Sequence, residues 1–195
     1  MCGRYQVITE EEELREIIFR ALSGDGIFSR VTQRSSEVFP SDVEPVLTAS
    51  GGAYRPRLLK WGFPMSGKSS AIINARSETA QEKPLFSRKL MDGRCIVPCS
   101  GFFEWTHDQS TQKLKYLFTT PGERVMFMAG LYGMFDGVPC FTILTAQANA
   151  SISDIHSRMP LVLPRSILSD WLFDDAAASD ILRREPPMLA RSISA

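Results

Sequence analysis

Two short apolar runs meet in Arg94-Cys95-Ile96-Val97-Pro98-Cys99-Ser100-Gly101-Phe102-Phe103-Glu104-Trp105, with a Ser-Gly pair between them. Runs of β-branched and aromatic residues bounded by Gly, Pro or Ser are typical of strands, which predicts strands at 94–98 and 101–106. The same pattern continues in both directions along the chain. It predicts further strands at 46–49, 54–61, 71–75, 114–120, 125–132 and 140–145. Short strands in such number indicate a curled sheet or a barrel.

Helices are expected around this β-rich centre. Thr9-Glu10-Glu11-Glu12 has the form of a capping box, and apolar residues recur at helical spacing from Leu14 to Leu22, which predicts an amphipathic helix over 10–22. Further helices are predicted near 84–91 and at 149–154, 166–172 and 176–183, whereas the tail from Pro186 to Ala195 shows no pattern. The predicted class is α+β, with a curled mixed or antiparallel sheet or barrel-like β core and flanking helices. The simplest organisation is one domain, 1–195.

Composition excludes several functional classes. The chain has 22 basic and 22 acidic residues, so no global field attracts nucleic acid, and polyanion binding would need a local group of arginines. No apolar run has transmembrane length, and the acidic start is unlike a signal peptide. Four cysteines are too few for a disulfide scaffold of this size, which favours a reduced, cytoplasmic protein with free thiols.

Cys2, directly after the initiator methionine, carries the most specific chemistry. Methionine aminopeptidase removes Met1 before a small residue such as cysteine. The mature chain would then begin with a thiol and an α-amine on adjacent carbons, with ordinary pKa values of about 8.5 and about 8. Such a 1,2-aminothiol condenses with an aldehyde to an imine, and the sulfur closes a five-membered thiazolidine. The alternative is that Cys2 is simply a small N-terminal residue without a role.

Glu104 stands between two aromatic residues in a predicted strand. Because side chains alternate along a strand, it could point to solvent while Phe103 and Trp105 point inward. The other possibility is a buried carboxyl group, which is costly unless it is paired. Burial of a carboxyl group raises its pKa toward the range that suits proton transfer.

The chain has only two histidines. His156 follows a predicted short helix in Ile155-His156-Ser157-Arg158-Met159-Pro160 and could be structural or catalytic. His107 lies in a polar turn and is interpreted as solvated. A metal site built from His156 and the cysteines is disfavoured, because Cys95 and Cys99 have three residues between them and no matching second pair, whereas zinc sites show tighter, duplicated spacing. We therefore expect no metal and no cofactor.

Four segments, taken in order, resemble the SRAP family (SOS response-associated peptidase). They are Met1-Cys2-Gly3-Arg4-Tyr5, Asn74-Ala75-Arg76-Ser77-Glu78-Thr79, the Arg94–Trp105 stretch, and His156-Ser157-Arg158-Met159-Pro160. Trp61-Gly62-Phe63-Pro64 also looks like the family's Trp-Gly segment, although the following Ser66–Ser70 stretch lacks the second tryptophan expected nearby. The resemblance covers nearly the whole chain. Bacterial and animal members of this family protect abasic sites in single-stranded DNA.

The resemblance implies four catalytic residues. Cys2 would condense with C1′ of the ring-opened abasic sugar and form a thiazolidine DNA–protein crosslink. Asn74 would position the reacting atoms, and Glu104 would move protons during imine formation and ring closure. His156 would act on the sugar as acid or base and help to reverse the crosslink.

The resemblance also implies a DNA-binding set that needs no cofactor. Arg4, Arg76 and Arg158 would hold flanking phosphates, and Pro40 and Thr145 belong to the same expected surface. Trp61 and Trp105 could stack on bases or lie in the core.

Two alternatives use the same residues: a peptidase with an N-terminal cysteine nucleophile, which could expose Cys2 by autoproteolysis, and a passive single-stranded-DNA-binding module. The expected partners are single-stranded DNA with abasic sites and replication-fork proteins. The expected state is a cytoplasmic, nucleoid-associated monomer that takes part in DNA repair and the SOS response.

Overall fold

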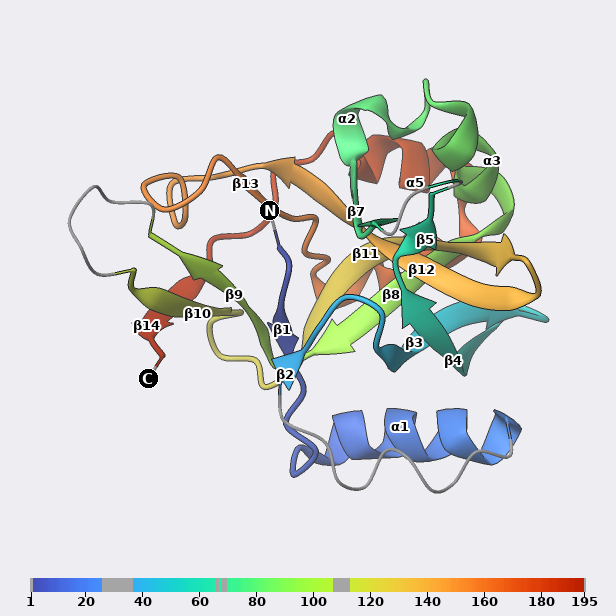
Figure 1. Ribbon diagram of the computed structural model, residues 1–195, viewed down its shortest axis with the longest axis horizontal. Coiled ribbons are helices and arrows are strands. Elements are labelled where there is room, and N and C mark those ends of the chain that lie inside the picture. The colour runs from blue at the N-terminus through green and yellow to red at the C-terminus, as the bar shows by residue number, and fades with distance from the viewer. Residues whose placement is uncertain (1, 26–36, 66, 68–69, 107–112, 195) are drawn as a thin grey trace.

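The centre of the fold is a closed five-stranded barrel, seen in a computed structural model that describes residues 2–25, 37–65, 67, 70–106 and 113–194 (Figure 1). Its strands are β3 (Val43–Ser50), β4 (Ala53–Trp61), β8 (Arg94–Cys99), β11 (Met126–Phe135) and β12 (Val138–Gln147). They pair in the order β11-β8-β3-β4-β12, and β12 pairs again with β11, which closes the ring. The β4–β12 pair is parallel and the other four are antiparallel. The expected mixed, barrel-like core is confirmed.

The second half of β12 carries two further strands. β7 (Asn74–Arg76) runs parallel to it with Asn74 opposite Ile143, beyond the point where β4 stops pairing at Trp61 and Phe141. β13 (Arg158–Pro160) is antiparallel to it, with Arg158 opposite Gln147. Two of the segments singled out in the sequence are thereby fixed on the same strand.

A second, antiparallel sheet joins distant parts of the chain in the order β14-β10-β9-β1-β2. Its strands are β1 (Tyr5–Gln6), β2 (Glu37–Val38), β9 (Gly101–Trp105), β10 (Lys115–Thr119) and β14 (Ala190–Ile193). Only Ser100 separates β8 from β9, so the stretch that opens the sequence argument passes directly from the barrel into this sheet. A small pair, β5 (Phe63–Pro64) with β6 (Ala71–Ile72), completes the strands of the described residues.

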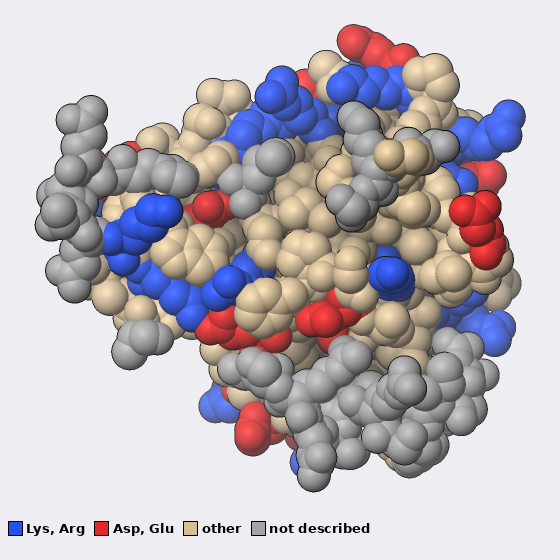
Figure 2. Space-filling view, viewed as in Figure 1, with Lys and Arg blue, Asp and Glu red and all other residues tan. Residues whose placement is uncertain are grey.

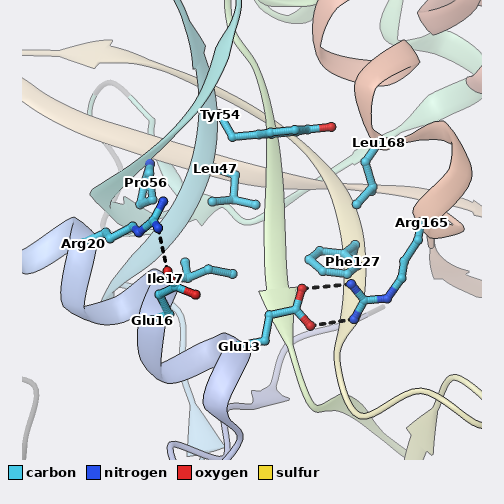
Figure 3. Close-up of a pocket in the computed structure, with 10 residues that line it drawn as sticks. All are labelled: Glu13, Glu16, Ile17, Arg20, Leu47, Tyr54, Pro56, Phe127, Arg165 and Leu168. Carbon is cyan, nitrogen blue, oxygen red and sulfur yellow. Dashed lines mark hydrogen bonds and ion pairs between the residues drawn. The ribbon is translucent and has the colours of Figure 1, made fainter.

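The helices cover the outside of the barrel. α1 (Glu12–Asp25) lies against β3 and β4 through its buried face, and Figure 1 shows it below the barrel, far from the N-terminus. The others are α2 (Ser77–Ala80), α3 (Pro84–Asp92), the 3-10 turn η1 (Arg165–Ile167), α4 (Leu168–Phe173) and α5 (Asp175–Ile181). A cavity of about 300 Å³ remains between α1, the barrel and η1; its apolar floor includes Leu47 and Phe127, and an ion pair between Glu13 and Arg165 borders it (Figure 3).

Several predicted elements differ from the structure. The first helix begins later than predicted, at Glu12, because Glu11 N donates to Ile8 O in a turn that precedes it, and it extends to Asp25. The predicted helix at 149–154 is wrong: these residues form turns, in which the Asn149 side chain accepts from Ser151 N and so competes with helical hydrogen bonding. The tail contains β14, which owes its strand conformation to pairing with β10.

Arg94 connects the barrel to the C-terminal helices from a buried position. Its guanidinium donates to Trp171 O at 2.6 Å, to Leu172 O at 3.3 Å and to Leu90 O, and it forms an ion pair with Asp175 at 2.7 Å. Three carbonyl groups near the ends of α3 and α4 thus find a donor that the helices themselves cannot supply. Among the described residues, no helix is long and apolar enough to cross a membrane.

Candidate active site

Cys2 lies just before β1, fully buried, and is held from a distant strand. The Asn74 side chain at the start of β7 donates from Nδ2 to Cys2 O at 2.9 Å. The Cys2 thiol in turn lies 3.8 Å from Arg4 O. Because Asn74 is fixed by the β7–β12 pairing, the hydrogen bond to Cys2 O ties Cys2 to the barrel.

The surroundings of Cys2 keep its thiol protonated. Burial raises the pKa of Cys2 well above its ordinary value, and the negative charge of Glu104 and the neighbouring Cys99 raise it further. Glu104 lies on β9 opposite Tyr116 and is only 4% exposed. The alternative in which Glu104 faces solvent is therefore wrong. A carboxyl group near a thiol is an arrangement that general-base catalysis can use.

His156 follows the 149–155 turns, where its backbone N donates to Ile152 O at 3.0 Å. Its ring Nδ1 accepts from Arg158 N at 2.9 Å and lies 3.1 Å from Arg158 O. The Arg158 backbone thus fixes the orientation of the His156 ring.

The Arg158 side chain is itself firmly bound. It forms a bidentate ion pair with Glu78, at 2.5 and 2.9 Å, and donates to Thr145 O at 2.5 Å and to Thr145 Oγ1 at 3.2 Å. The hydrogen bond from Arg158 lowers the pKa of Glu78. Thr145 is 1% exposed, so its contribution to an expected DNA surface is to hold Arg158 rather than to touch DNA directly.

The expected DNA-binding residues separate into exposed and buried groups. Pro40 and Arg76 are exposed, and Arg4 is partly exposed beside Cys2. Trp61 is fully buried: its Nε1 donates to Ile73 O at 3.0 Å, and its ring packs against Tyr5 with centroids 5.1 Å apart. Of the two alternatives for Trp61, the core position is the one observed, and base stacking by its ring is excluded in this conformation.

Three charged partners of the candidate site, Glu78, Glu37 and Lys115, were not predicted from the sequence. Glu78 lies within a quoted segment, but nothing in the sequence indicates that its partner, Arg158, is 80 positions away. Glu37 forms an ion pair with Arg4 at 3.0 Å and another with Lys115. Lys115 would have been found only from the β9–β10 register.

The structure joins most of the predicted catalytic residues. Cys2 accepts a hydrogen bond from Asn74, and the charge of Glu104 raises the pKa of its thiol. His156 contacts Arg158, which pairs with Glu78 just after β7. The described part of the chain holds no group of three or more His, Cys, Asp or Glu side chains that could bind a metal ion. Met1 and His107 lie outside the described residues.

The chain belongs to the SRAP family: residues 1–192 match the family described as SOS response associated peptidase. One relative, the abasic site processing protein YoaM of Bacillus subtilis, is 32% identical over 194 residues, which is 94% of this chain and 84% of the relative. Another, the abasic site processing protein YedK of Escherichia coli, is 25% identical over 185 residues, covering 92% of this chain and 83% of the relative.

Solved structures show the same fold. A protein from Bordetella bronchiseptica superposes with a TM-score of 0.78 at 22% identity, covering 100% of both chains. A protein from Bacteroides thetaiotaomicron also gives 0.78, at 23% identity, covering 98% of this chain and 91% of that one.

Proposed function

We propose that this protein recognises abasic sites in single-stranded DNA and forms a thiazolidine crosslink with them through Cys2 after removal of Met1. The hydrogen bond from Asn74 to Cys2 O carries the proposal, because it gives the first residue of a mature chain a fixed position beside a carboxyl group. Family membership and relatives named abasic site processing proteins support the choice of substrate.

The reaction balances without a cofactor. The Cys2 amine attacks C1′ of the ring-opened deoxyribose, and loss of one water gives an imine. The thiol sulfur then bonds to C1′, while the thiol proton passes to the imine nitrogen. Because burial raises the thiol pKa, the amine reacts first and the thiol needs a base, a role we assign to Glu104.

The other residues act on position and on the sugar. Asn74 holds the Cys2 backbone so that amine and thiol meet the same carbon. His156, whose ring is oriented by the contact of its Nδ1 with Arg158 N, would act on the sugar hydroxyl groups as acid or base. Arg4, Arg76 and Arg158 supply the phosphate contacts, with Glu78 orienting Arg158. Replication-fork proteins remain expected partners.

The test is to mix the protein with a uracil-containing oligonucleotide treated with uracil-DNA glycosylase, and to analyse the product by denaturing gel and intact mass. We expect a denaturant-stable band without borohydride, with the summed mass less one water. Cys2→Ala and undamaged DNA are the controls. If protein whose mass shows that Met1 is absent gives no such band, the crosslinking mechanism is wrong.

The peptidase alternative is less well supported. A cysteine peptidase depends on a thiolate, whereas the surroundings of Cys2 raise its thiol pKa. A passive DNA-binding module would bind equally well after Cys2→Ala and give no covalent product, so the same experiment separates it from the crosslinking enzyme.

A further inference from the structure

Next to the proposed active site, an exposed phenylalanine ring just after β2 and a half-buried tryptophan ring in β9 are bordered by cations. Figure 2 shows Lys and Arg side chains around tan rings on the left of this face, where Figure 1 places β9, β10 and β1. The Arg4 guanidinium carbon lies 4.3 Å from the ring centroid of Phe39 and 4.9 Å from that of Trp105. We refer to Phe39, Arg4 and Trp105 as the Phe39 platform.

Phe39 is held in place at the surface. It is 40% exposed, although its neighbour Val38 in β2 is buried. Its backbone N donates to Asp42 Oδ2 at 2.9 Å, and Asp42 N donates back to Phe39 O at 3.1 Å. Ser41, within the same turn, donates from its backbone N to Trp61 O at 2.8 Å, which ties the turn to the barrel. The exposed ring is therefore presented on a rigid support.

Arg4 is fixed as well. Its ion pair with Glu37 at 3.0 Å holds the planar guanidinium between the two rings, and Glu37 also binds Lys115. Lys115 in turn lies 4.2 Å above the Phe103 ring. Two cations, Arg4 and Lys115, thus lie beside the aromatic rings here. That combination suits a nucleotide, whose base stacks while its phosphate is attracted.

We propose that the Phe39 platform stacks an intact base next to the abasic sugar bound at Cys2. This inference rests on the proposed function and narrows its substrate: an abasic site with an ordinary nucleotide on one defined side. Arg4 is only two residues from Cys2, so a nucleotide on the platform and a sugar at Cys2 are neighbours on one strand. Stacking on an aromatic side chain contributes about 1–3 kcal/mol per base, which corresponds to about 5- to 150-fold in affinity.

The test measures binding without the covalent reaction. The oligonucleotides carry a tetrahydrofuran analogue of the abasic site, which has no aldehyde, flanked by 2-aminopurine or by a second tetrahydrofuran on the 5′ or the 3′ side. Fluorescence anisotropy gives the affinity, and quenching of 2-aminopurine reports stacking. We expect about 5- to 150-fold weaker binding when the base is absent from one particular side.

Substitutions of Phe39 assign the effect to the platform. Phe39→Ala should remove the dependence on that flanking base and the quenching, whereas Phe39→Trp should keep both. Phe19→Ala, which removes a 58% exposed ring from α1, is the matched control and should behave as the wild type. Equal binding of all oligonucleotides by the wild type, or unchanged flank dependence in Phe39→Ala, would overturn the inference. Crosslinking of a real abasic site by the wild-type protein is measured in a separate assay. Failure of the wild type to crosslink there would count against the proposed function and not against the Phe39 platform.

Discussion

Asn74 offers the sharpest test of how Cys2 is positioned. Asn74→Ala removes the 2.9 Å hydrogen bond to Cys2 O, a neutral bond worth about 0.5–1.5 kcal/mol, so the crosslinking rate should fall about 2- to 13-fold. Asn74→Asp keeps the size but places a carboxylate oxygen against the Cys2 carbonyl oxygen. An unmade hydrogen bond and repulsion together cost about 2–4 kcal/mol, or about 30- to 900-fold in rate.

The assay is the initial rate of denaturant-stable crosslink, with folding checked by circular dichroism. Gln147→Ala, which removes an exposed carboxamide from β12, is the control and should keep the wild-type rate. As the pH falls, the Asn74→Asp carboxyl group gains a proton and can donate again, so its rate relative to Asn74→Ala should recover. Rates for Asn74→Asp within twofold of the wild type, or identical to Asn74→Ala at every pH, would refute the reasoning.

Three further predictions concern stability and thiol reactivity. Arg94→Leu leaves three carbonyl acceptors without their donor and should lower the free energy of unfolding in urea by about 3–5 kcal/mol. Glu78→Gln should slow crosslinking at neutral pH by loosening Arg158. Since Arg158 lowers the pKa of Glu78, the stability difference from the wild type should be present above pH 4.5 and shrink as the pH falls through the lowered pKa. Burial raises the pKa of Cys99 to about 12 and that of Cys95 still higher, so neither thiol should react with iodoacetamide at pH 8 until urea unfolds the protein.

Each of these three predictions can be contradicted by a specific result. The control Arg20→Leu, on the exposed face of α1, should change the free energy of unfolding by less than about 0.5 kcal/mol. If Arg94→Leu changes the free energy of unfolding by no more than this control, the buried guanidinium does not stabilise the fold as argued. A stability difference between Glu78→Gln and the wild type that persists unchanged below the folded-state pKa of Glu78 would show that the ion pair is not its source. Rapid alkylation of Cys99 in folded protein would contradict its burial.

Local sequence patterns were sufficient to predict most strands of the barrel. The strands at 94–99 and 101–105 and the helix at 84–92 follow from apolar runs bounded by Gly and Pro, and each lies within about one or two residues of its predicted range. The failures have one distant cause and one local cause. β14 is a strand because β10 provides a pairing edge, and the Asn149 side chain turns a helical pattern into turns.

The site was predictable by residue type but not by contact. Cys2, Asn74 and Glu104 could be named from the sequence, while the burial of Glu104 depends on the sheet that forms around it. Phe39 gave no signal, because a single phenylalanine before Pro40 looks like any other turn residue. Its meaning depends on Arg4, which the β1–β2 pairing brings to it from 35 positions away.

The placement of Cys2 by strands from the second half of the chain has a consequence for synthesis. Cys2 leaves the ribosome first, but the strands that bury it, with Asn74 and Glu104, come much later, and Arg158 follows last. At about 5–20 residues per second, translation from Cys2 to His156 takes about 8 to 30 s. Throughout that interval a processed N-terminus is an unshielded aminothiol, open to any cellular aldehyde. Under the proposed function, folding therefore does two things at once for Cys2: it assembles the proposed reaction centre and ends a period of unselective reactivity.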